Sequence, residues 1–78
     1  MQQNRIRELR EDSDLTQKYI ASYLRVAQNT YSNYENGNRE IPIYQLIKLA
    51  EYYNVNMDYL LGRTDVKDPL PPTKRIPL

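Results

Sequence analysis

Apolar residues recur at helical spacing in five segments of the chain, and short polar connectors separate them. Residues 4–12, 17–24, 28–36 and 57–61 each carry a short stripe of this kind, so each segment predicts a short helix. Pro42 predicts the start of the remaining helix, as a first residue that needs no amide partner. The clearest stripe follows it, at Ile43, Leu46, Ile47, Leu49, Ala50 and Tyr53. The pattern therefore predicts an all-α fold of five short helices.

Polar residues and glycines mark the ends of several predicted helices. Thr16 can cap the helix that begins at residue 17, because its hydroxyl can accept a hydrogen bond from an amide of the first turn. Asn56 can cap the last helix in the same way. Gly37 and Gly62 follow predicted helices at the position where a left-handed residue is commonly needed.

The composition changes at residue 65. Four of the five prolines, at 69, 71, 72 and 77, lie in the last fourteen residues, which hold little that could form a core. We therefore expect one helical domain over residues 1–64, followed by an extended or disordered Pro-rich tail over 65–78.

The composition excludes several classes of function. Among the 78 residues there is no cysteine, histidine or tryptophan, so disulfides, the usual zinc ligands, cysteine nucleophiles and imidazole bases are missing. Carboxylates, lysines, tyrosines and hydroxyls are what remains for any chemistry. We expect no enzymatic activity, no cofactor and no metal. The chain shows neither a secretory signal nor a membrane-spanning run, so a soluble cytoplasmic protein is expected.

Charge is distributed unevenly, although the net charge is only +1. Between residues 15 and 34 the charged residues are Lys18 and Arg25, with Arg39 just beyond, whereas the acids lie on either side of this segment. If Val26, Tyr31 and Tyr34 face inward, the outer face of the 28–36 helix carries almost only amides and hydroxyls. Amides present a donor and an acceptor together, which matches the major-groove edge of adenine. An ordinary solvated helix would more often carry Glu, Lys and Arg.

The stretch from residue 15 to 37 resembles the helix-turn-helix of the Cro/C1-type regulators, also called the XRE family, whose fold is that of the lambda repressor. Gln17, Ala21, Val26, Tyr31 and Tyr34 match the family pattern in order. The resemblance implies that the 28–36 helix enters the major groove while the start of the 17–24 helix meets the DNA backbone. The DNA-contacting residues predicted in this way are Gln17, Lys18, Gln28, Asn29, Thr30, Ser32, Asn33, Asn36 and Arg39.

Three positions depart from that pattern. Arg25 stands in the turn where the family often has glycine, and a left-handed residue with a Cβ atom costs about 1 kcal/mol. Ala27 replaces the Ser or Thr that commonly caps the following helix, a loss of about 1 kcal/mol. Tyr19 replaces the Glu that would complete a capping box with Thr16.

The resemblance implies a transcriptional regulator, in most cases a repressor, that binds double-stranded operator DNA as a homodimer. We expect the contact between copies at the last helix, around Tyr59 and Leu60. The alternative function is a protein-interaction module, such as an antitoxin-like partner whose groove and Pro-rich tail hold another protein.

Overall fold

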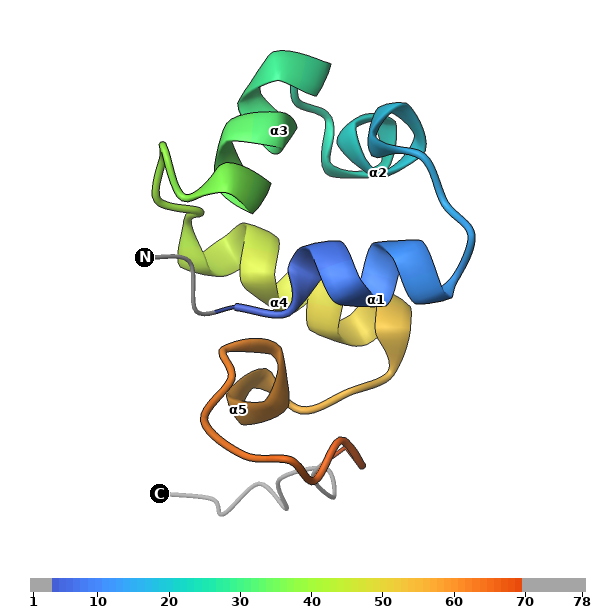
Figure 1. Ribbon diagram of the computed structural model, residues 1–78, viewed down its shortest axis with the longest axis vertical. Helices are drawn as coiled ribbons and strands as arrows, with labels where there is room; N and C mark the ends of the chain where they lie inside the picture. Colours follow the sequence, from blue (N-terminus) through green and yellow to red (C-terminus); the bar gives the residue numbers. More distant parts are fainter. Residues whose placement is uncertain (1–3, 70–78) are drawn as a thin grey trace, which may run out of the picture.

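The computed structural model describes residues 4–69, and within them the chain is all-helical, as predicted (Figure 1). Five helices follow one another along this part of the chain: α1 (Ile6–Asp12), α2 (Gln17–Leu24), α3 (Gln28–Asn36), α4 (Ile43–Tyr53) and α5 (Met57–Leu60). The predicted fold class is confirmed. Residues 70–78, most of the predicted Pro-rich tail, lie outside the described residues.

The predicted helix ends are confirmed where their signals were local. The Thr16 hydroxyl accepts a hydrogen bond from the Tyr19 amide at 3.0 Å, and the Asn56 side chain accepts one from the Tyr59 amide at 2.7 Å. Gly37 ends α3 in the left-handed region with φ of 77°. Arg25 ends α2 with φ of 61°, which confirms that a residue with a Cβ atom occupies the left-handed turn.

Three predicted boundaries were wrong by one or two residues. α1 begins at Ile6 because Asn4 stays outside the helix, where its side-chain oxygen accepts a hydrogen bond from the Ile6 amide at 3.2 Å. Pro42 is the residue before α4: its ψ of 150° is extended, and its carbonyl accepts the first hydrogen bonds of the helix. α5 ends at Leu60, and Leu61 forms its cap.

All five helices contribute to one core. The largest fully buried side chains of this core are Tyr31, Ile6, Ile20, Leu49 and Leu60. Each large apolar side chain buried in this way contributes about 1.5–3 kcal/mol to folding. Ala21 is also buried, and its small side chain allows a neighbouring helix to approach α2 closely.

The apolar stripe of α4 is wider than the surface it buries. Leu46, Leu49 and Ala50 belong to the core, but Ile43 and Ile47 are 69% and 46% exposed. Gln45 is buried instead, where its Nε2 donates to the carbonyl of residue 24 at 3.1 Å and satisfies the C-terminal end of α2. The predicted apolar stripe of α4 therefore includes two isoleucines that the core does not cover.

The α4–α5 connector holds the chain that follows α5. The Asn56 Nδ2 atom donates to the carbonyls of Val66 and Asp68 at 2.7 and 2.9 Å, and the Asn56 amide donates to the carbonyl of Lys67 at 3.2 Å. The first residues of the predicted tail are thus tied to the helical domain.

Candidate nucleic-acid interface

Helices α2 and α3 form the candidate site. They lie next to each other at one end of the molecule, and α5 lies at the opposite end (Figure 1). The turn between them is short because the Arg25 and Val26 amides donate back to the carbonyls of Ser22 and Ala21. This arrangement leaves one side of α3 open to solvent.

The predicted contact residues of α3 occupy this open side to different degrees. Gln28, Asn29 and Asn36 are exposed, whereas Thr30, Ser32 and Asn33 are half-buried. The inward face belongs to Tyr31 and Tyr34, which are 0% and 3% exposed. The outward register inferred for Gln28 and Asn29 therefore agrees with their burial in the structure.

Both helices present amino-terminal ends that favour negative charge. The first turns of α2 and α3 contain no acidic residue, and helix amino termini carry a partial positive charge. Lys18 is exposed in the first turn of α2, and Arg39 is exposed in the loop after α3. These features suit a polyanion lying along the two helices.

Below this surface α3 carries a buried carboxylate, Glu35, which was not among the residues predicted from the sequence. Its side chain is 0% exposed. Arg10 donates from Nε to Oε2 at 2.6 Å and from Nη2 to Oε1 at 3.2 Å. Arg7 and Gln17 donate to the same Oε1 atom at 3.3 and 3.0 Å. Glu35 thus joins α3 to both α1 and α2.

The ionisation of this cluster follows from burial and pairing. Burial opposes the charge of Glu35, but the hydrogen bonds from Arg10, together with those from Gln17 and neighbouring groups, outweigh it and hold the pKa of Glu35 below its usual value. Burial, followed by the nearby Glu35 carboxylate, raises the pKa of Tyr31 far above that of a free phenol. At neutral pH Glu35 is therefore charged and Tyr31 is neutral.

Two predicted contact residues are also members of this cluster. The Gln17 side-chain nitrogen donates a hydrogen bond to Glu35, and the Asn36 side-chain oxygen accepts one from Arg7. Their side chains are held by α1 and α3 contacts, in contrast to those of Gln28 and Asn29, for which the structure gives no such anchor. A sequence signal for Glu35 existed: it follows Tyr31 and Tyr34 at the i, i+3, i+4 spacing of one helix face.

The expected contact between copies needs correction. Leu60 is fully buried in its own core, and Tyr59 is half-buried with the Arg5 guanidinium 4.3 Å from its ring centre. A partner cannot reach Leu60 at the surface. On the helices, the most exposed large apolar residues are Ile43 and Tyr44, at 69% and 63%.

The described residues show neither a metal-binding cluster nor a membrane-spanning helix. Between residues 4 and 69, no group of three carboxylate, cysteine or histidine side chains is placed to bind a metal ion. In the same part of the chain, no helix has the length and apolar character to cross a bilayer.

Comparisons with known proteins point in the same direction as the geometry. A family model described as helix-turn-helix matches residues 6–60. The chain is 42% identical over 62 residues to the HTH-type transcriptional regulator ImmR of Bacillus subtilis. The matched residues cover 80% of this chain and 49% of that protein. The chain is 38% identical over 65 residues to the uncharacterized HTH-type transcriptional regulator YobD of the same species, covering 83% of this chain and 58% of that protein.

A phage protein is also similar. The cryptic phage CTXphi transcriptional repressor RstR of Vibrio cholerae is 34% identical over 62 residues, covering 80% of this chain and 56% of that protein. This chain thus matches about half of the length of each of these relatives. No solved structure matches it significantly. Because the family model covers more than half of the chain and the matched residues include α2 and α3, the chain belongs to the helix-turn-helix family, of the Cro/C1 type that its sequence resembles.

Proposed function

We propose that this chain is a sequence-specific DNA-binding regulator of transcription, acting as a repressor, with α3 in the major groove of its operator. The observation that carries the proposal is the outward face of α3, on which the side-chain amides of Gln28 and Asn29 are exposed and which has no charged residue before Glu35. In addition, the first turns of α2 and α3 contain no acidic residue. The similarity to a transcriptional regulator and to a phage repressor supports the proposal. The named relatives are proteins of bacteria, in which transcription takes place in the cytoplasm, so we place the action there.

The proposed division of labour separates base reading from backbone binding. Gln28 and Asn29 lie in the first turn of α3, the part of a recognition helix that reaches base edges, and a bidentate amide contact to adenine gives about 1–3 kcal/mol of discrimination. Thr30, Ser32, Asn33 and Asn36 extend the polar face along the helix. Lys18 and Arg39 are assigned to phosphates, and Gln17 to the backbone near the start of α2.

We further propose that two copies bind a pseudo-palindromic operator. Helix-turn-helix units commonly read half-sites one helical turn apart, so a two-fold dimer matches the symmetry of such DNA. Since Leu60 is buried, we assign the contact between copies to the exposed Ile43 and Tyr44 at the start of α4. Sedimentation of the protein with and without a duplex carrying two half-sites measures this stoichiometry.

The test begins with selection of bound duplexes from a random pool, followed by binding measurements on the selected operator and on random DNA. Gln28→Ala should weaken operator binding by about 1–3 kcal/mol and relax preference at one base pair per half-site. Binding to random DNA should change little. Arg39→Ala should lower affinity for all sequences and reduce the salt dependence by about one counterion per chain.

Ser13→Ala is the control, because Ser13 is exposed at the end of α1 and is not one of the proposed contact residues. It should leave both affinities unchanged. If Asn29→Ala or Asn33→Ala removes base preference while Gln28→Ala does not, the assignment along α3 is wrong. If none of the three affects duplex binding, α3 is not a recognition helix, and the protein-interaction function takes its place.

A further inference from the structure

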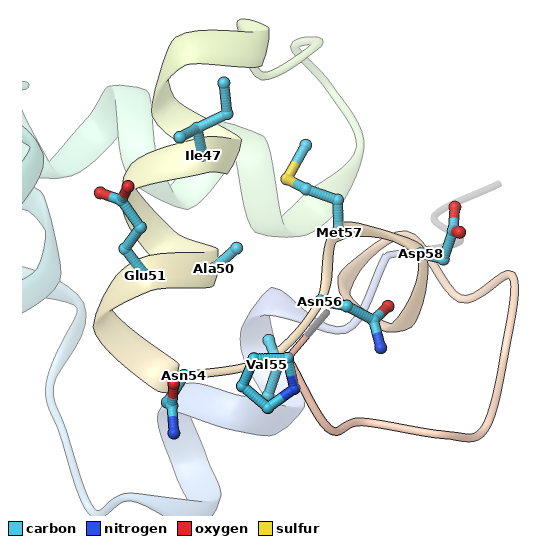
Figure 2. A pocket seen from close by; sticks show the side chains of 9 residues that line it. Ile47, Ala50, Glu51, Asn54, Val55, Asn56, Met57 and Asp58 are labelled. Carbon is cyan, nitrogen blue, oxygen red and sulfur yellow. The ribbon is translucent and has the colours of Figure 1, made fainter. Parts of the chain in front are cut away.

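An apolar groove lies between the second half of α4 and the start of α5, on a part of the molecule that the proposed DNA interface does not use (Figure 2). Ile47, Ala50, Val55 and Met57 supply its apolar lining, and its volume is about 350 Å³. In Figure 2, Ile47 and Ala50 lie one below the other on α4, and Met57 lies across from them. Ile47 is 46% exposed here, so the groove explains one of the two isoleucines that the core leaves uncovered.

The chain itself leads to this groove. Asn56, which lines it, holds the carbonyls of Val66, Lys67 and Asp68 through its side chain and its amide. Pro69, the next residue and the last one described, is part of the lining. The described part of the chain therefore ends in the wall of the groove.

The sequence that follows matches the groove in chemistry. Residues 70–78 read Leu-Pro-Pro-Thr-Lys-Arg-Ile-Pro-Leu, with apolar residues near both ends and two adjacent cations at positions 74 and 75. The groove carries apolar side chains in its middle and two acids, Glu51 and Asp58, at its outer margins (Figure 2). Asp58 also lies 3.7 Å from Arg63, an exposed pair, so Glu51 is the stronger candidate partner for a cation of the tail.

The length of the tail and the cost of ordering it are compatible with docking in the same chain. Nine residues in an extended, Pro-rich conformation span about 28 Å at roughly 3.1 Å per residue. The stretch of α4 from Ile47 to Asn54 is only about 10 Å long at 1.5 Å per residue. Prolines restrict the free chain, so less freedom is lost on docking, and a short tether keeps the local concentration of the tail at about the millimolar level.

We propose that residues 70–78 dock in this groove of their own chain, placing apolar side chains against Ile47, Ala50 and Met57 and a cation beside Glu51. The DNA-binding face of α3 lies at the other end of the molecule, so this surface is separate from the proposed interface (Figure 1). The docked tail would cover apolar surface that otherwise stays exposed next to α4.

A nitroxide attached to the full chain at Thr73→Cys tests the proposal, because the chain has no other cysteine and Thr73 supplies neither the apolar nor the cationic contact. Methyl signals of Ile47, Ala50 and Met57 should lose most of their intensity, and those of Ile20 and Ala21 on α2 should keep it. A diamagnetic label at the same position is the reference. Retained intensity at all three groove methyls would overturn the proposal.

Mixing experiments and charge reversal identify the occupant. In a mixed sample, one copy carries the nitroxide but no NMR-visible isotope, and the other carries isotope-labelled methyl groups but no nitroxide. No loss of methyl intensity is expected in this sample. A loss would mean that the groove binds a second copy, and it would overturn docking within one chain. Glu51→Lys should reduce tail occupancy by roughly two- to fivefold, as expected for an exposed ion pair. Glu40→Lys, an exposed acid outside the groove, should not, and equal effects of the two would remove the charge argument.

Discussion

Replacement of Arg10 by methionine should destabilise the domain strongly, because it leaves the buried carboxylate of Glu35 without its main partner. The Arg10 side chain is 12% exposed and the Glu35 side chain is 0% exposed. Arg10 supplies two hydrogen bonds to this carboxylate, at 2.6 and 3.2 Å, and a third to the carbonyl of Leu15 at 2.7 Å. Arg7, 51% exposed, and Gln17 would remain.

The expected loss is about 3–5 kcal/mol, the usual cost of leaving a buried charge uncompensated. A chain of this size has a total unfolding free energy of roughly 4–12 kcal/mol, so the variant should be close to unfolding at room temperature. Urea denaturation followed by helical circular dichroism at pH 7 measures the loss. Glu11→Ala is the matched control, since Glu11 pairs with the same arginine at 3.9 Å but is 61% exposed; it should change stability by less than about 0.5 kcal/mol.

The pH dependence of the loss distinguishes a charge effect from a packing effect. In the native protein the pKa of Glu35 is lowered, so the pair stabilises the fold above the unfolded pKa, and this contribution disappears as pH falls through the folded pKa. In Arg10→Met, burial should raise the pKa of Glu35, and protonation removes the unpaired charge. The deficit relative to the native protein should therefore shrink between pH 7 and pH 4. A deficit below about 1 kcal/mol at pH 7, or one equal at both pH values, would refute this reasoning.

Four other substitutions, at three positions, test local features of the fold: those at Arg25 and Thr16 by thermal or urea unfolding, and the two at Asn56 by hydrogen exchange. Arg25→Gly should be neutral or stabilising by up to about 1 kcal/mol, because glycine relieves the left-handed strain at φ of 61° while its freer unfolded chain offsets part of the gain; a clear loss of stability would show that the arginine is not strained. Thr16→Ala should cost about 1 kcal/mol through loss of the α2 cap, and no loss would mean that the cap hydrogen bond adds nothing. Asn56→Asp should keep the α5 cap but lose the side-chain hydrogen bonds to the carbonyls of residues 66 and 68. Hydrogen exchange should therefore become faster at the backbone amide of residue 56, which donates to Lys67, and stay unchanged at the Tyr59 amide. Asn56→Ala should make exchange faster at both amides.

The parts of the fold that the sequence predicted well depend on neighbours within a few residues. Thr16 and Asn56 each cap an amide three residues away, and Gly37 meets a backbone requirement at its own position. Such signals are complete within one turn of helix, so they can be read without knowing the tertiary structure. The same holds for the outward register of Gln28 and Asn29, which follows from the inward tyrosines on the same helix.

The features that the sequence did not predict depend on distant partners. Glu35 and Arg10 are 25 positions apart, and only the packing of α1 against α3 brings them together. Periodicity assigns Ile43 and Ile47 to the apolar side of α4, but it does not say how wide a strip the other helices cover. For the same reason, Leu60 was assigned to a surface although it is fully buried in the core.

The Glu35 cluster links the stability of the domain to the placement of its proposed reading face. Arg10 and Arg7 come from α1, Gln17 comes from the first turn of α2, and all three converge on one carboxylate in the last turns of α3. A buried charge needs a geometry that satisfies its partners, so we expect the cluster to help set how α3 packs against α1 and α2. Gln17 belongs both to this cluster and to the proposed backbone contact. A substitution that loosens Glu35 should therefore impair operator binding even where the protein remains folded, because the amides of α3 would no longer meet base edges at one orientation.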